Sequence, residues 1–76
     1  MDKELREKLA DVQHAIWSHW MDYLFNQCQE YPDGSMMIPA EKALHWQRQL
    51  NTPYAELTER EKDSDRDQAD KVLEVL

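Results

Sequence analysis

The sequence predicts a small all-α domain of three helices, with a long central N-terminal helix and a capped C-terminal helix. Three observations predict this class: apolar residues recur at helical spacing, no segment alternates apolar and polar residues as strands do, and helix-breaking residues are few. The single glycine and the three prolines lie within residues 32–39 and at position 53. Residues 1–76 are therefore expected to form a single helical domain.

The first and longest helix is expected over residues 3–29. One apolar stripe recurs at spacings of three and four: Leu5, Leu9, Val12, Ile16, Trp20 (or His19) and Tyr23. A second stripe consists of Ala10, Trp17, Met21, Leu24 and Cys28. Because the two stripes together make residues 15–28 apolar round most of the helix, we expect this part to be the centre of the core, contacted from two sides.

A turn and a shorter helix follow. Residues 31–34, Tyr-Pro-Asp-Gly, suit a type I turn, with proline at the second position and glycine at the fourth. The apolar run at residues 36–38 is expected to lie over the first helix. Pro39 suits the first position of a helix, which predicts a helix over residues 39–50. Its apolar side is expected to be Ala43, Leu44, Trp46 (or Gln47) and Leu50.

Residues 52–76 carry the most concentrated local signals. Pro53 blocks a helix, and Tyr54 to Leu57 suits a single turn with an apolar residue at each end. Thr58 and Glu61 fit a capping box, in which each side chain bonds to the backbone N–H of the other residue. The last helix should run from about Glu59 to the C-terminus, with its inward face formed by Ala69, Val72, Leu73 and Leu76.

The charge and the cysteine content exclude several classes of partner. The net charge is −7, from nine basic and sixteen acidic residues. No basic patch is available to neutralise phosphates, so we expect neither nucleic-acid binding nor binding to an anionic membrane surface. Cys28 is the single cysteine, and neither a signal peptide nor a membrane-spanning apolar run is visible. These features predict a cytoplasmic protein.

No arrangement of residues indicates catalysis, a metal or a cofactor. His14 and His19 lie about 140° apart on a helix, whereas metal-binding pairs share one face. Cys28 lies on an apolar stripe, where a buried thiol is unreactive. A single glycine excludes a glycine-rich phosphate loop. The acidic pairs of the last helix are interleaved with Arg and Lys, which favours solvated ion pairs. We therefore expect a protein that is not an enzyme.

The aromatic residues allow two interpretations. The residues concerned are Trp17, Trp20, Tyr23, Trp46 and Tyr54. Aromatic residues at helical spacing usually belong to a core. They could also form the wall of a small pocket in which a planar ligand stacks on a ring. Arg48, Lys62 or Arg66 could then hold its phosphate.

Residues 52–76 resemble a known family through the motif Pro53-Tyr54-x-x-Leu57-Thr58-x-x-Glu61-Lys62-x-x-Asp65-Arg66, followed by an apolar helix to Leu76. Together with a weaker match, His14-x-x-Trp17, this motif resembles the ryanodine-receptor domain family, especially its small phage and prophage members. The resemblance implies a small helical module, located in the bacterial host if phage-encoded, that binds a nucleotide-like molecule. The positions that match the motif are Trp17, Tyr54, Lys62, Asp65 and Arg66.

Two functions therefore remain open. One is a protein-interaction or regulatory module that recruits a protein partner or self-associates, because a chain of this size buries only a small core and its surface is acidic. The other is binding of a nucleotide-like small molecule. Arg66 has a structural alternative to ligand contact: its guanidinium could reach an acid or a carbonyl and fix the Pro53 loop against the last helix.

Overall fold

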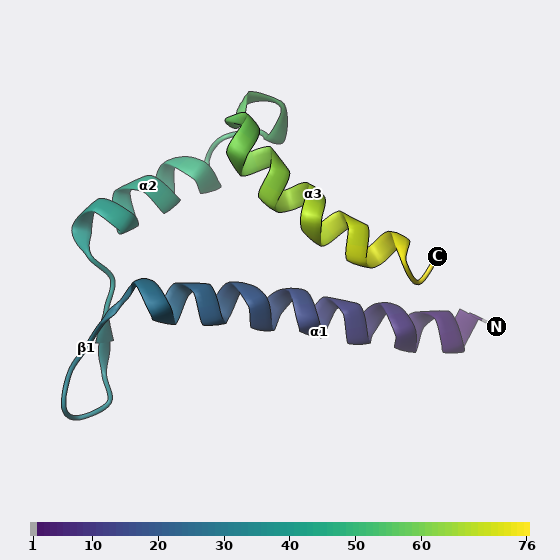
Figure 1. Cartoon of the computed structure of the whole chain (residues 1–76), viewed down its shortest axis with the longest axis horizontal. Coiled ribbons are helices and arrows are strands. Elements are labelled where there is room, and N and C mark those ends of the chain that lie inside the picture. The colour runs from purple at the N-terminus through teal and green to yellow at the C-terminus, as the bar shows by residue number, and fades with distance from the viewer. Residues whose placement is uncertain (1) are drawn as a thin grey trace.

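The computed structural model describes residues 2–76, and the side chains from residue 3 onward. The elements follow one another as α1 (Asp2–Gln27), β1 (Gln29–Glu30), β2 (Met36–Met37), α2 (Ala40–Leu50), the 3₁₀ turn η1 (Tyr54–Glu56) and α3 (Glu59–Leu73) (Figure 1). The predicted all-α class with three helices, a long first helix and a capped last helix is confirmed.

The three helices form the sides of an open triangle. In Figure 1, α1 is the long side, α2 leaves from the hairpin at its end, and α3 returns toward the N-terminal end of α1. α1 and α3 are in contact, and both termini lie at the same end of the molecule. The backbone spans 46 × 35 × 16 Å. In the view of Figure 1, down the shortest axis, no helix lies over another, so the protein is a single layer of helices.

A short β-hairpin, which the sequence pattern did not predict, joins α1 to α2. β1 and β2 pair antiparallel, with Gln29 opposite Met37 and Glu30 opposite Met36. The Gly34 N–H donates to the Tyr31 carbonyl at 3.0 Å, and Gly34 has φ +89°, a conformation that favours glycine. Strands of two residues are too short to produce a detectable alternation.

The apolar run after the turn does not cover α1. Met36, Met37 and Ile38 are all exposed, so the expectation that they would lie over the first helix is wrong. Pairing with β1 carries the first two of them into the hairpin, which projects beyond the end of α1 (Figure 1). The backbone hydrogen bonds of the hairpin therefore determine where Met36 and Met37 lie, and their side chains do not pack on α1.

The expected core around residues 15–28 is absent. Among residues 3–76, no hydrophobic side chain is buried. Ile16, Trp20, Met21, Leu24 and Cys28 are half-buried, whereas Trp17, Tyr23 and Phe25 are exposed. The prediction that this part of α1 would be contacted from two sides is wrong because the helices lie in one layer, which leaves the two faces of the triangle uncovered.

α2 begins one residue later than expected, and the residues on its shielded side differ in part from those predicted. Pro39 precedes the helix, in an extended conformation with φ −58° and ψ 145°. Ala43 and Trp46 are half-buried, as expected. Leu44 and Leu50 are 68% and 82% exposed, so their placement on the covered side is wrong. No second layer packs on α2 among the described residues, and only the residues that face the interior of the triangle are shielded.

α3 is rotated relative to the expected orientation. The capping box is present: the Glu61 N–H donates to Thr58 Oγ1 at 3.2 Å, and the Thr58 N–H donates to Glu61 Oε1 at 3.0 Å. Of the expected inward residues, Val72 is half-buried, but Ala69, Leu73 and Leu76 are exposed. The shielded face instead follows Leu57, Glu61, Ser64, Gln68, Val72 and Val75. The contact between Glu61, in the first turn of the helix, and His45 of α2 sets this rotation.

Candidate functional site

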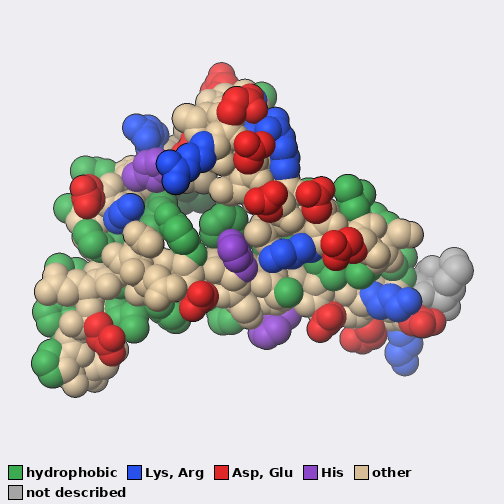
Figure 2. All heavy atoms as spheres, in the orientation of Figure 1, with side chains coloured by type: hydrophobic (Ala, Val, Ile, Leu, Met, Phe, Trp, Pro, Cys, Tyr) green, Lys and Arg blue, Asp and Glu red, His purple; other side chains and the backbone are tan. Residues whose placement is uncertain are grey.

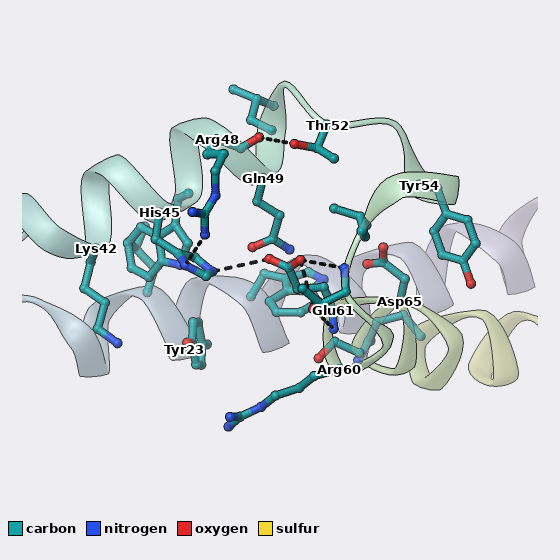
Figure 3. A pocket seen from close by; sticks show the side chains of 18 of the residues that line it. Tyr23, Lys42, His45, Arg48, Gln49, Thr52, Tyr54, Arg60, Glu61 and Asp65 are labelled. Carbon is teal, nitrogen blue, oxygen red and sulfur yellow. Dashed lines mark hydrogen bonds and ion pairs between the residues drawn. The ribbon is translucent and has the colours of Figure 1, made fainter.

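A hollow of about 1350 Å³ lies at the centre of the triangle, between the three helices. Figure 2 shows hydrophobic side chains around this hollow, with acidic and basic side chains along the outer edge of α3. Its aromatic lining consists of Trp20, Tyr23, Trp46 and Tyr54. Its basic lining consists of Lys42, Arg48 and Arg60, and acidic residues such as Glu61 and Asp65 lie among them (Figure 3).

A chain of aromatic rings joins α1 to α2 across the hollow. Trp20 meets Tyr23 nearly edge-to-face, with ring centroids 6.1 Å apart and an angle of 88° between the rings. Tyr23 in turn meets Trp46 at 6.1 Å. His19 packs against the other side of Trp20 at 4.9 Å. Tilted and edge-to-face pairs of this kind are favourable beyond the area that they bury. Of the five aromatic residues considered for a core or a pocket wall, Trp20, Tyr23, Trp46 and Tyr54 line the hollow and Trp17 does not.

A polar relay joins α2 to α3. Arg48 Nη2 lies 3.3 Å from His45 Nδ1, and His45 Nε2 lies 3.4 Å from Glu61 Oε2 (Figure 3). A guanidinium can only donate, so His45 Nδ1 accepts and its Nε2–H points toward Glu61. Hydrogen bonds from Thr58 are the main cause that lowers the pKa of Glu61, with a smaller contribution from His45.

Glu61 thus has two structural roles. It caps α3 through Thr58, as the sequence predicted, and it holds α3 against α2 through His45. The contact with His45 sets the rotation of α3 about its axis. Because Glu61 lies on the same side of the helix as Ser64 and Gln68, this side faces the hollow. No local pattern indicates a contact between residues 45 and 61, so only the tertiary structure could show it.

Arg66 makes its main contacts within α3 rather than to the Pro53 loop, where they were expected. Its Nη1 donates to Asp63 Oδ1 at 2.7 Å and to Glu59 Oε2 at 3.1 Å, and both acids belong to α3 itself. The bonds to Asp63 and Glu59 raise the pKa of Arg66, and the bond from Arg66 lowers the pKa of Glu59. Arg66 therefore acts mainly within α3, and its link to the loop is a smaller interaction with Tyr54, which also raises the pKa of Arg66.

The five candidate ligand residues do not converge on one point. Tyr54 and Asp65 line the hollow, and Lys62 Nζ lies 5.8 Å from the centre of the Tyr54 ring. Lys62 also pairs with Glu59, at 3.6 Å. Arg66 lies among the outer ion pairs of α3. Trp17 stacks on His14 with ring centroids 5.9 Å apart and is 55% exposed, away from the residues that line the hollow.

Gln68 is the residue that the sequence interpretation missed. Within residues 3–76 it is the one buried polar side chain, 9% exposed, and it lines the hollow. Its Oε1 has no hydrogen-bond partner among the described residues. A buried polar atom left without a partner costs about 1–3 kcal/mol. The available signal was an uncharged side chain within a strongly charged helix.

In the described part of the chain, no three or more His, Cys, Asp or Glu side chains come together to hold a metal ion. None of the helices described is sufficiently long and apolar to cross a membrane. Comparison with protein-family models, with curated proteins and with solved structures gives no match.

Proposed function

We propose that this chain is a non-enzymatic protein-interaction or regulatory module, and that a protein partner completes the hydrophobic core that the chain lacks alone. One observation carries this proposal. Among residues 3–76 no hydrophobic side chain is buried, while thirteen large ones are exposed. Full burial of one such side chain is worth about 1.5–3 kcal/mol, and these residues, which are 38–82% exposed, forgo part of it.

The dimensions of the molecule support the same proposal. A compact chain of this length has a radius of gyration of about 11 Å, whereas this chain has 15.6 Å. The largest apolar patch on a soluble monomer is normally about 300–600 Å², and larger patches mark sites of interaction. Here exposed hydrophobic residues occur on all three helices and on the hairpin.

A crosslinking experiment tests the interaction function in the native host or in an expression host. A photoreactive amino acid at Leu44, which is 68% exposed, should give covalent adducts to protein on irradiation. The same amino acid at Asp70, which is exposed on the charged helix α3, should give few. Adducts at neither position, or equal amounts at both, would contradict the proposal. Mass spectrometry of the adducts identifies the partner, whether another protein or a second copy.

A second candidate is the binding of a nucleotide-like small molecule. The observation that favours it is the combination of aromatic rings, the cations Lys42 and Arg48, and the unpaired Gln68 Oε1 around one hollow. The resemblance of residues 52–76 to the ryanodine-receptor domain family supports it, and the same resemblance implies a phage or prophage origin and a bacterial cytoplasmic location.

A thermal-shift panel of mono-, di- and cyclic nucleotides tests this second candidate. A ligand at about 100 times its dissociation constant adds about 2.7 kcal/mol to the free energy of unfolding. We expect the shift to shrink when Trp46 is replaced by leucine and to persist in the Trp17→Leu control if the hollow is the site. A shift that depends on Trp17 alone would locate the ligand outside the hollow, and no shift with any nucleotide would remove this candidate.

A further inference from the structure

The missing element of this fold is a second layer. Stable domains pack at least two layers of secondary structure around a hydrophobic core. In the view down the shortest axis of the molecule no helix lies over another, so this chain supplies only one of the two layers (Figure 1). Something that presents a comparable flat, apolar layer must therefore cover the triangle.

The accessible surface area indicates how large that covering layer is. The chain exposes 6444 Å², whereas a compact protein of 9.1 kDa exposes about 4900 Å². The excess is about 1500 Å² per chain, so pairing two copies should bury at least about 3000 Å². Standard-size complexes bury about 1600 Å² in total, whereas obligate homodimers and permanent hetero-complexes bury about 2000–5000 Å². The excess therefore fits an obligate interface, of the size that two copies of this chain would form.

The rim of the hollow provides a surface that can pair with itself. We define the rim as the three exposed large hydrophobic residues that also line the hollow: Tyr23 of α1, Leu50 of α2 and Tyr54 of η1. In a two-fold symmetric pair the same patch meets itself, so the rim residues of one copy can pack against the rim residues of the other, with the charged residues of the lining around them.

We propose that two copies of this chain pack face to face over the rim residues, as a two-fold symmetric homodimer in which each copy supplies the helix layer that the other lacks. This inference rests on the proposed interaction function and names its partner. Each copy carries a net charge of −7, so the two copies repel each other. Apolar burial drives the pairing, and added salt strengthens it by screening the repulsion.

Sedimentation of the full chain tests the proposal. At about 100 μM the wild-type chain should sediment at twice 9.1 kDa, and its unfolding midpoint should rise with protein concentration, as expected when subunits stabilise one another. Raising the salt concentration from about 0.05 to about 0.5 M should tighten the dimer. A monomer whose unfolding midpoint does not change with concentration would overturn the proposal. So would a dimer that weakens with salt, since its attraction would be ionic.

A matched pair of variants locates the surface. Leu50→Glu and Leu76→Glu make the same change at side chains that are 82% and 75% exposed, so neither removes much packing within one chain. Leu50 belongs to the rim and Leu76 does not. Leu50→Glu should weaken the dimer at least about ten-fold, which is 1.4 kcal/mol, while Leu76→Glu should leave it unchanged. Equal effects of the two variants would exclude the rim. Far-UV circular dichroism should show that both variants keep their helices, and the wild-type measurements remain decisive if one of them does not.

The crosslinks from Leu44 separate this inference from the function on which it rests. Adducts to a second copy support self-association and the interaction function, and the comparison of Leu50→Glu with Leu76→Glu then shows whether the rim is the surface. A wild-type monomer that crosslinks to a different protein overturns the homodimer and leaves the interaction function in place. A wild-type monomer without protein adducts overturns both the homodimer and the interaction function.

Discussion

Replacing Trp46 with alanine should lower the free energy of unfolding by about 2–3 kcal/mol. Trp46 is half-buried and supplies the α2 end of the aromatic chain, where Tyr23 meets it at 6.1 Å. Fully buried Trp to Ala changes cost about 3–5 kcal/mol, and the partial exposure of Trp46 reduces that figure. Urea unfolding followed by circular dichroism measures the effect. In a domain of this size, each 1 kcal/mol also lowers Tm by about 4–8 °C.

Trp17→Ala is the matched control for this prediction. It is the same change on α1 at a side chain that is 55% exposed and lies outside the hollow. It should cost less than about 1 kcal/mol, as expected for a surface position. Both variants must be compared with the wild type at one protein concentration, because self-association would add concentration-dependent stability. Equal losses in the two variants would contradict the role given to the Tyr23–Trp46 contact.

Replacing Gln68 with methionine should stabilise the protein, by about 1–2 kcal/mol. The side chain is 91% buried by accessible area, and its Oε1 has no hydrogen-bond partner among the described residues. Methionine has nearly the same length and shape, so it fills the same space without a polar atom that needs a partner. Replacing a buried polar group that lacks its hydrogen bond with an apolar isostere removes a cost of about 1–3 kcal/mol. Thermal and urea unfolding of the same preparation measure the gain.

Gln13→Met is the control for the effect of methionine itself. Gln13 is exposed on α1, and the change there should alter stability by less than about 0.5 kcal/mol. If Gln68→Met is instead destabilising while Gln13→Met is neutral, the Gln68 amide has a hydrogen-bond partner in solution. That outcome would strengthen the case for a polar ligand in the hollow, because Gln68 is the buried amide that lines it.

The candidate site could be predicted only in part. Aromatic residues around a pocket were anticipated, and Trp20, Tyr23 and Trp46 do form its wall. Trp17 belongs to the same sequence stripe as Met21, yet it is turned outward. A helical period identifies a stripe about 100° wide, and a small rotation of the helix moves residues at its edge from shielded to exposed positions. The contact between His45 and Glu61 and the burial of Gln68 join segments for which the sequence offers no local signal.

The sequence by itself determined the local structure of this protein. Thr58 with Glu61, the proline before α2 and the glycine turn each act through backbone hydrogen bonds or fixed dihedral angles within a few residues, so the start of α3, the start of α2 to within one residue and the turn at Gly34 follow from them. The tertiary structure alone decided which apolar faces are covered. Leu44, Leu50 and Leu73 satisfy the helical period and are nevertheless exposed. Periodicity shows that a face is apolar, whereas the arrangement of the three helices in one layer decides whether anything packs against it.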